Sequence, residues 1–572
     1  MKTLLSKLQT LPTWQFLLLY LGSMLLIKCI LGLQGFDMCD EGWVLSAYQQ
    51  IFDCPSSCEY QFLYYNTIVI GGVWNKLFGA WGIYGFRVFN AICCTALAYV
   101  IYLLLKDSVN RWAIFIGVLI FNFGYVLVFH QNVITALLCT IGCLFLYKGL
   151  MQKSPLMMLL AGIVVGINFF TRLPNVSMLS LSLTLIPYYL YNRDLKNTLL
   201  MLMWAGIGII IGCTIEVLIM ISLNHFDLFI DNLSSGTSAA TSGDSTHSLT
   251  KILHVYGSNY ATVRKQIGLL VSFPVVLYFL GKLNKTQWLN KIVFIIGGLL
   301  YAAFLWKKCE LTFFIYGFSY LVFVIYALRF YSDKATIYLI SIASCVLFFL
   351  PFGSDYGIGN MGPNCIWIAT PLAVGLAWKM LQQVSNSTHH KIILTTLVTC
   401  LVVVSAHELY RSSLSCYFDS GSRLKKTSLI DNSLATTFTT KEKCEKANIM
   451  LNELSKYIKK GDYLLCFQCI PMVNYLTETR PYLGNSWPWS YDSSNLEYQF
   501  EKAQKNIDKL PIVIWNKSGI ASWQNHASDW NSLKSNDQWN FNSKKIQLMN
   551  EFIEKHNYQT VWENDLFKIM IP

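Results

Sequence analysis

The sequence has few charged residues for its length. Only 13% of its 572 residues are Asp, Glu, Lys or Arg, whereas a soluble domain has about 25%. The deficit lies in residues 1–407, which hold 24 of the 44 Lys and Arg and 14 of the 32 Asp and Glu. This composition excludes a water-soluble protein over that range. We therefore expect a membrane domain at 1–407 and a soluble domain at 408–572, whose composition is ordinary.

Other familiar signals are also missing. No small-x-small cleavage site follows the first apolar run, residues 15–33, so we expect a retained first helix instead of a signal peptide. The tail, 408–572, has no nucleotide-binding loop, metal cluster or catalytic triad. We therefore expect it to act as a lid or in acceptor recognition.

Long apolar runs dominate the first 407 residues. At 1.5 Å per residue each can cross most of a bilayer. The runs are 15–33, 83–105, 112–129, 132–149, 156–170, 174–191, 198–222, 264–281, 291–306, 311–328, 335–350, 365–381 and 391–407. Lys and Arg concentrate in alternate loops, which fixes the N-terminus inside under the positive-inside rule. Thirteen spans then place the tail outside.

Two outer segments, 34–82 and 223–263, are long. Within the first, Trp43–Phe52 and Tyr65–Phe78 mix apolar, aromatic and polar residues, which is typical of helices lying at the membrane surface. The tail alternates helical and strand patterns and predicts a small α/β domain. Its predicted helices are 441–460 and 545–556, and its predicted strands are 462–467, 511–515, 558–562 and 566–571.

The cysteines fall into two groups. Those in apolar helices, including Cys93, Cys94 and Cys139, are expected to be small core residues. Cys54 and Cys58 bracket Pro-Ser-Ser in a polar outer loop, where either a disulfide or two free thiols would fit.

Acidic residues gather just after the first helix, in Phe36-Asp37-Met38-Cys39-Asp40-Glu41-Gly42-Trp43. A carboxylate at this depth can meet both a lipid head group and a water-soluble partner, and could act as a general base. The alternative is a helix cap, with Asp37 or Asp40 accepting backbone N–H groups. Both roles fit the pattern.

This arrangement of a first helix followed by Asp40-Glu41-Gly42 at the start of a surface helix resembles the GT-C glycosyltransferases. The most similar members are the protein O-mannosyltransferases and the aminoarabinose transferase of lipid A modification. The resemblance implies a polytopic α-helical membrane protein of about 13 spans with a small extracytoplasmic α/β domain. It also implies a polyprenyl-phosphate sugar donor, and it places the catalytic Asp at Asp40, with Glu41 beside it. Asp37 is an additional acid three residues earlier, so either Asp could be the base.

A leaving lipid phosphate needs cations in a low-dielectric site. Arg172 is the strongest candidate, because it interrupts the apolar stretch Phe169-Phe170-Thr171-Arg172-Leu173-Pro174, where a charge is costly. Its alternative is snorkelling to lipid head groups. The other outer-side candidates are Arg87, Lys251, Arg264 and Lys307, for which solvation or lipid contact is the alternative.

Four polar residues on the outer side could contact the sugar or the acceptor: His130, Asn132, His247 and Asp355. A polar cap or a turn is the alternative for each of them. The clustered acids could also hold a divalent cation, because Mg²⁺ and Mn²⁺ prefer oxygen ligands. The sequence assigns no metal.

Together these features predict an inverting glycosyltransferase that moves a sugar from a polyprenyl-phosphate carrier to an acceptor lipid, glycan or protein at the outer face. A transporter or flippase of lipid-linked saccharide is the alternative, although it would favour charges near the bilayer centre. We expect a bacterial inner membrane with the tail in the periplasm. The basic excess of the membrane part indicates anionic lipid or phosphate partners and not nucleic acid.

Overall fold

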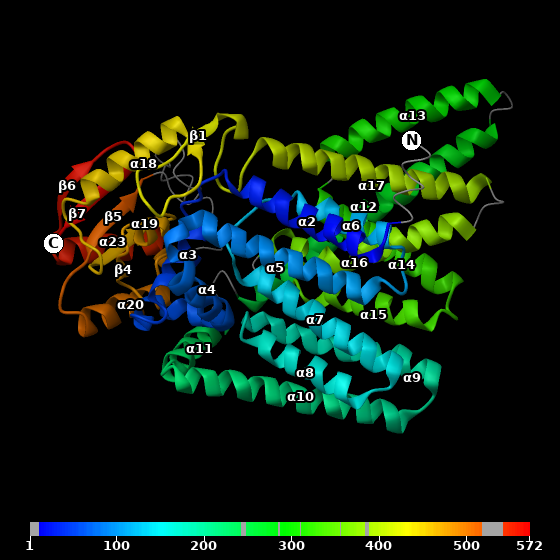
Figure 1. Ribbon diagram of the computed structural model, residues 1–572. Helices are drawn as coiled ribbons and strands as arrows, with labels where there is room; N and C mark the ends of the chain where they lie inside the picture. Colours follow the sequence, from blue (N-terminus) through cyan, green and yellow to red (C-terminus); the bar gives the residue numbers. More distant parts are fainter. Residues whose placement is uncertain are drawn as a thin grey trace.

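The computed structural model describes residues 11–241, 248–283, 287–308, 310–354, 356–383, 388–517 and 542–572. A long helical bundle forms one end of the molecule and a small domain containing a β-sheet forms the other (Figure 1). Figure 1 shows α9 (Leu185–Asn192) at the bundle end farthest from the sheet.

The chain enters through α2 (Thr13–Gly32). The outer segment then folds as α3 (Asp40–Gln50), the 3₁₀ helix η1 (Pro55–Tyr64), α4 (Tyr65–Phe78) and η2 (Gly79–Trp81), and α5 (Gly82–Leu105) returns through the bundle. The two predicted surface helices are thus present. However, α3 is buried on nearly all sides, so it is not a helix lying on the membrane surface as expected.

Each of the other predicted spans overlaps helical chain, although α6 ends at Asn122, seven residues before the end of the predicted span 112–129. The helices are α6 (Arg111–Asn122), α7 (Gln131–Gln152), α8 (Pro155–Phe169), η3 (Leu173–Thr184), α9, α10 (Leu195–Ser222), α11 (Phe226–Thr241), α12 (Leu249–Leu283), α13 (Gln287–Lys308), α14 (Leu311–Arg329), α15 (Lys334–Phe349), α16 (Ile358–Gln383) and α17 (Thr388–Leu414). Side-chain caps set several starts: Asn110, Ser154, Asp194 and Asp333 each accept a backbone N–H of the first turn.

The structure corrects the prediction of a long outer loop at 223–263. Its described residues are mostly helical, because α11 covers 226–241 and α12 begins at Leu249. A Ser/Thr/Gly-rich composition suggested a loop, but the apolar residues Phe229 and Val263 are buried and hold these helices against the protein.

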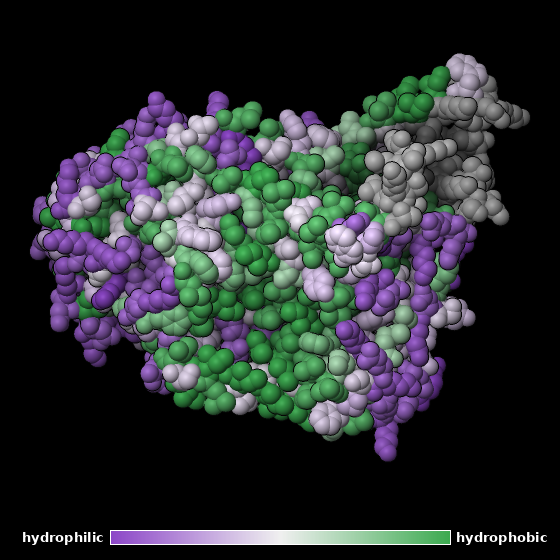
Figure 2. Space-filling view, in the orientation of Figure 1, coloured by the Kyte–Doolittle hydropathy of each residue, from purple (hydrophilic) through white to green (hydrophobic). Residues whose placement is uncertain are grey.

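A broad apolar band crosses the visible face of the bundle between two polar ends (Figure 2). Six helical stretches of the described chain are long and apolar enough to cross a membrane: Thr13–Gly32, Pro55–Leu105, Gln131–Gln152, Leu195–Ser222, Leu311–Arg329 and Ile358–Gln383. The chain therefore has the helices and the surface of an integral membrane protein. The count of thirteen spans stays a prediction.

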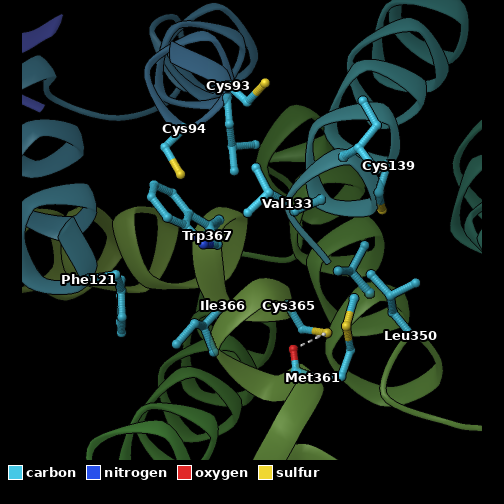
Figure 3. Packing of buried hydrophobic residues seen from close by; sticks show 14 of the residues in the cluster. Cys93, Cys94, Phe121, Val133, Cys139, Leu350, Met361, Cys365, Ile366 and Trp367 are labelled. Carbon is cyan, nitrogen blue, oxygen red and sulfur yellow. Dashed lines mark hydrogen bonds between the residues drawn. The ribbon is translucent and has the colours of Figure 1, made fainter. Parts of the chain in front are cut away.

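Small thiols and large rings fill the bundle core (Figure 3). Cys93, Cys94 and Cys139 are buried among apolar side chains, which confirms that they are core residues. The thiol of Cys365 donates to the carbonyl of Met361 one helical turn earlier (3.3 Å).

The tail contains a five-stranded sheet in the order β4-β3-β5-β7-β6. The strands are β3 (Tyr463–Phe467), β4 (Arg480–Pro481), β5 (Ile512–Asn516), β6 (Gln559–Glu563) and β7 (Phe567–Ile571). β4 and β5 flank β3 in parallel, whereas β7 is antiparallel to both β5 and β6. Its helices are α18 (Lys441–Leu454), α19 (Met472–Leu476), α20 (Ser493–Asn506) and α23 (Asn542–Lys555). The predicted α/β pattern is present, while β4, α19 and α20 add elements that it did not include.

Candidate active site

The acidic motif covers the end of the linker between α2 and α3 and the first turn of α3, where the tail meets the bundle (Figure 1). The linker forms hydrogen bonds with the tail at two points. The Gly35 N–H donates to the carbonyl of Phe438 (2.8 Å), and the Gln34 side chain donates to the carbonyl of Arg423 (3.0 Å). The partners in the tail lie about 400 residues later in the sequence (389 residues for the second pair). Distant segments of the chain therefore fix the position of the motif.

Asp37 caps α3. Its two carboxylate oxygens accept the backbone N–H groups of Cys39 (2.8 Å) and Glu41 (2.9 Å), and the side chain is fully buried. Burial raises the pKa of this carboxyl well above its usual range, and the charges of Asp40 and Glu41 raise it further, whereas the two N–H donors oppose that shift. An enclosed capping group has no path to a substrate. Asp37 is therefore a capping residue, as one of the two predicted roles has it, and a catalytic role for it stays a prediction.

Glu41 and Arg87 form a buried, two-pronged ion pair. Nε of Arg87 donates to Oε1 of Glu41 (3.0 Å) and Nη2 donates to Oε2 (2.7 Å). Nη1 of Arg87 also donates to the carbonyls of Gly32 (2.9 Å) and Gln34 (3.0 Å), just after α2. The guanidinium is thus used to hold α3 and the end of α2 together. The pair gives Arg87 and Glu41 a structural role, and phosphate binding by Arg87 stays a prediction.

Asp40 differs from both neighbours because its side chain is only partly buried. One of its carboxylate oxygens accepts the hydroxyl of Tyr417, a residue of the segment that enters the tail. Burial, followed by the charges of Asp40 and Asp37, raises the pKa of Tyr417, so this hydroxyl keeps its proton and remains a donor. Asp40 is therefore the one carboxylate of the motif that is both oriented and accessible.

Asp419 is a buried residue whose carboxylate joins the acidic motif to the tail. Its carboxylate accepts the backbone N–H of Phe36 (3.0 Å) and bonds the amines of Lys443 (2.6 Å) and Lys426 (3.1 Å). Burial lowers the pKa of Lys443, and the Asp419 charge opposes that shift. Neither Asp419 nor Tyr417 was found from the sequence, because both lie in an irregular segment with no periodic pattern.

The tail packs directly on α3 through α19. A Cβ added to Gly42 would lie 2.1 Å from the backbone N of Met472, so only glycine allows this approach. The Met472 N–H donates to the carbonyl of Met38 (3.0 Å), and the Trp43 indole donates to Asn485 (3.0 Å). The tail thus covers one side of the Asp40 segment.

The turn before α7 lies next to the motif. The Val128 N–H donates to Oε1 of Glu41 (2.9 Å), and the ring of His130 bonds the carbonyl of Val128 (3.0 Å). Burial lowers the pKa of His130 to about 4, so the ring is neutral at pH 7. Asn132 follows in the first turn of α7, half-buried. The structure therefore brings the His130–Asn132 turn beside the acidic motif.

Arg172 is buried between α8 and η3, and it does not extend into solvent as a snorkelling side chain would. Buried polar groups surround this turn: Asn175 donates to the carbonyl of Asn168 (3.0 Å), and Asn66 donates to the hydroxyl of Thr171 (3.5 Å). Arg172 is thus a buried arginine with buried polar side chains beside it.

The remaining predicted cations do not converge. Lys251 and Arg264 both lie on α12, 13 residues apart, which corresponds to about 20 Å along the helix axis. Arg264 is exposed, and Lys307 is exposed in the last turn of α13. These three residues therefore do not form one phosphate site. His247 and Asp355 lie outside the described residues.

The possible disulfide between Cys54 and Cys58 is not formed, and both are free thiols. Each thiol has its own partner: that of Cys54 is 3.3 Å from the Ser57 hydroxyl, and that of Cys58 donates to the carbonyl of Pro55 (3.4 Å). Within the described part of the chain, no three His, Cys, Asp or Glu side chains gather in a group that could hold a metal ion.

Comparisons with known proteins identify no family. No protein-family model matches the chain, and no curated protein sequence matches it. Among solved structures, the chain is similar to the oligosaccharyltransferase of Archaeoglobus fulgidus, crystallised with zinc and sulfate. That similarity covers 87% of this chain and 68% of the archaeal one, at 12% identity and a TM-score of 0.43. No conclusion about function follows from so weak a likeness.

Proposed function

We propose that this chain is an inverting glycosyltransferase of the GT-C type, which moves a sugar from a polyprenyl-phosphate carrier to an acceptor at the outer face of the membrane. One observation carries the proposal. Of the three carboxylates in the acidic motif, Asp37 caps a helix, Glu41 pairs with Arg87, and Asp40 alone is oriented by a neighbour while remaining accessible.

In this mechanism Asp40 accepts the proton of the acceptor hydroxyl. The acceptor oxygen then attacks the anomeric carbon from the face opposite the lipid phosphate. The carbon–oxygen bond to the phosphate breaks, and its electron pair leaves with the lipid phosphate. The Tyr417 hydroxyl keeps the Asp40 carboxylate in one orientation. If the acceptor is itself a phosphate, no strong base is required, and Asp40 orients the acceptor.

Arg172 is the residue we assign to the donor phosphate. Its charge is buried near the outer ends of the helices, where a cation interacts strongly with an anionic group. His130 and Asn132, beside the acidic motif, are the residues we assign to sugar or acceptor contact. The tail then covers the site and takes part in acceptor recognition, with the membrane as the source of the donor.

The test of the base is Asp40→Asn in the purified full-length protein, assayed for transfer from undecaprenyl-phosphate sugars. Loss of the base should lower the transfer rate by about 10²–10⁴-fold. Asp53→Asn is the matched control, because Asp53 lies in the same outer segment but is exposed and pairs with Lys76 (2.7 Å). Full transfer by the Asp40 variant would contradict the assignment. Movement of the lipid between leaflets without transfer would favour a flippase.

The test of the phosphate site is Arg172→Gln, with binding of undecaprenyl phosphate as the measurement. A hydrogen bond to a charged group contributes about 1.5–3 kcal/mol, so affinity should fall by roughly 10- to 150-fold. The exposed Arg329→Gln, which is not among the phosphate candidates, serves as the control. Unchanged affinity in the Arg172 variant would remove this residue from the donor site.

A further inference from the structure

Two free cysteines meet where the tail covers the acidic motif. Cys39 lies between Asp37 and Asp40 in the linker, and Cys469 follows β3 in the tail. Both are buried, with 5% and 1% of their surface exposed, and the Cys469 thiol lies close enough to Cys39 to raise its pKa. They are 430 residues apart in sequence, so their contact depends on docking of the tail.

The backbone on either side of the pair holds the two segments in register. Met38, next to Cys39, accepts the Met472 N–H at 3.0 Å. The Ser46 hydroxyl of α3 donates to the carbonyl of Pro471 at 3.1 Å. The close approach of Gly42 to Met472 adds a third contact between the same segments. The contact between the thiols is thus fixed by several independent interactions, and Figure 1 shows α3 and α19 side by side.

We propose that Cys39 and Cys469 form a disulfide-bonding site that locks the tail over the Asp40 segment. This inference goes beyond the proposed sugar transfer and does not depend on it. The oxidant is a disulfide-bearing molecule or protein of the outer compartment. One cysteine thiolate attacks a sulfur of that oxidant and releases one thiol. The other cysteine then attacks the mixed disulfide and releases the second thiol. The pair loses two protons and two electrons, and the oxidant becomes two thiols.

The local environment sets when this reaction occurs. Burial, and then the neighbouring Cys469, raise the pKa of Cys39 well above its usual range. A thiol held in its protonated form reacts slowly in exchange. The bond therefore forms while the tail is docking or transiently loosened, and it is then shielded by the same burial. This timing distinguishes a locking bond from an exposed redox sensor.

The experiment uses the purified full-length protein in detergent, reduced and then incubated with oxidised glutathione at pH 8.5. Free thiols are alkylated, the protein is digested without reduction, and linked peptides are identified by mass spectrometry. We expect the Cys39–Cys469 linked peptide in at least tenfold excess over any other linkage of Cys39, including the nearby Cys416. Cys39 and Cys469 recovered as free thiols, as separate glutathione adducts or paired with other cysteines would overturn the proposal.

Variants provide a second readout. Oxidation should raise the unfolding temperature of the native chain, because the bond closes a very long loop. The same treatment should leave Cys469→Ala unchanged. Cys444→Ala is the matched control, since it removes another buried thiol of the tail but keeps the pair. An equal rise in the Cys469→Ala variant would contradict a bond at this site. Because the native chain alone gives the linked peptide, poor folding of a variant does not prevent the test.

Discussion

Replacing Arg87 by alanine separates a structural ion pair from a phosphate-binding arginine. The guanidinium makes four hydrogen bonds of 2.7–3.0 Å, two to Glu41 and two to the carbonyls of Gly32 and Gln34. The exposed fractions of the two paired side chains are 2% and 1%. Arg87→Ala therefore leaves a carboxylate and two carbonyl groups buried without these partners.

The expected cost is large because the pair is buried. Removing one partner of a buried ion pair destabilises a protein by about 3–5 kcal/mol, whereas an exposed pair contributes about 0–1 kcal/mol. Glu41 retains the Val128 N–H as a donor (2.9 Å), which offsets only part of the loss. Glu41→Ala removes the opposite partner and should cost a similar amount.

The assay is a double-mutant cycle on thermal and denaturant unfolding of the detergent-solubilised protein. If the two side chains act as a pair, Arg87→Ala and Glu41→Ala together should cost less than the sum of the single changes. We expect a coupling energy of about 1.5–3 kcal/mol. Additive effects with little change in stability, combined with weaker binding of undecaprenyl phosphate, would refute the structural role of Arg87.

Two further predictions concern the tail contact and pH. Gly42→Ala places a Cβ against the backbone of Met472, which should loosen the packing of α19 on α3. Backbone hydrogen exchange in α19 should therefore become at least tenfold faster. Gly22→Ala is the control, since its Cβ would have no neighbour within 4 Å. For His130, the pKa falls from 6.5 to about 4 on folding, so only the unfolded chain takes up this proton between those values. Stability should therefore decrease as pH falls from about 6.5 towards 4. In the His130→Gln variant, the difference between the unfolding temperatures at pH 7 and pH 5 should be smaller than in the native chain. An identical difference would contradict the lowered pKa of His130.

Apolar runs and turn residues predicted most elements of the bundle and of the sheet domain. Hydrophobic periodicity is local, and helices such as α5 and strands such as β5 follow it closely. The acidic motif was also visible, because three acids after a first helix are unusual in an apolar chain. Their separate roles were not visible, since Asp37 and Asp40 have the same chemistry in sequence. What distinguishes them is that Asp37 accepts two backbone N–H groups of its own segment, whereas Asp40 accepts the hydroxyl of the distant Tyr417.

The helix α11 and the role of Arg87 were missed for the same reason. A helix with several Ser and Thr residues has a weak apolar pattern, and its position depends on packing against other parts of the chain. Arg87 resembles a phosphate ligand until its partner is known. Glu41 lies 46 residues earlier, on a different helix. No local pattern indicates a pairing of that kind.

The contacts that complete the candidate site also determine when it can assemble. Phe36 bonds Asp419, Trp43 bonds Asn485, and Glu59 bonds Lys502. The second residue of each pair lies 383, 442 and 443 residues after the first, so each bond can form only after the second residue has been synthesised. At about 5–20 residues per second, translation places roughly 20–90 s between the first and second member of each pair. The membrane helices are inserted during that interval, while the acidic motif is not yet covered by the tail. A nascent chain that stops before residue 419 would therefore carry the acidic motif without the tail that orients it. The candidate site is thus complete only at the end of synthesis.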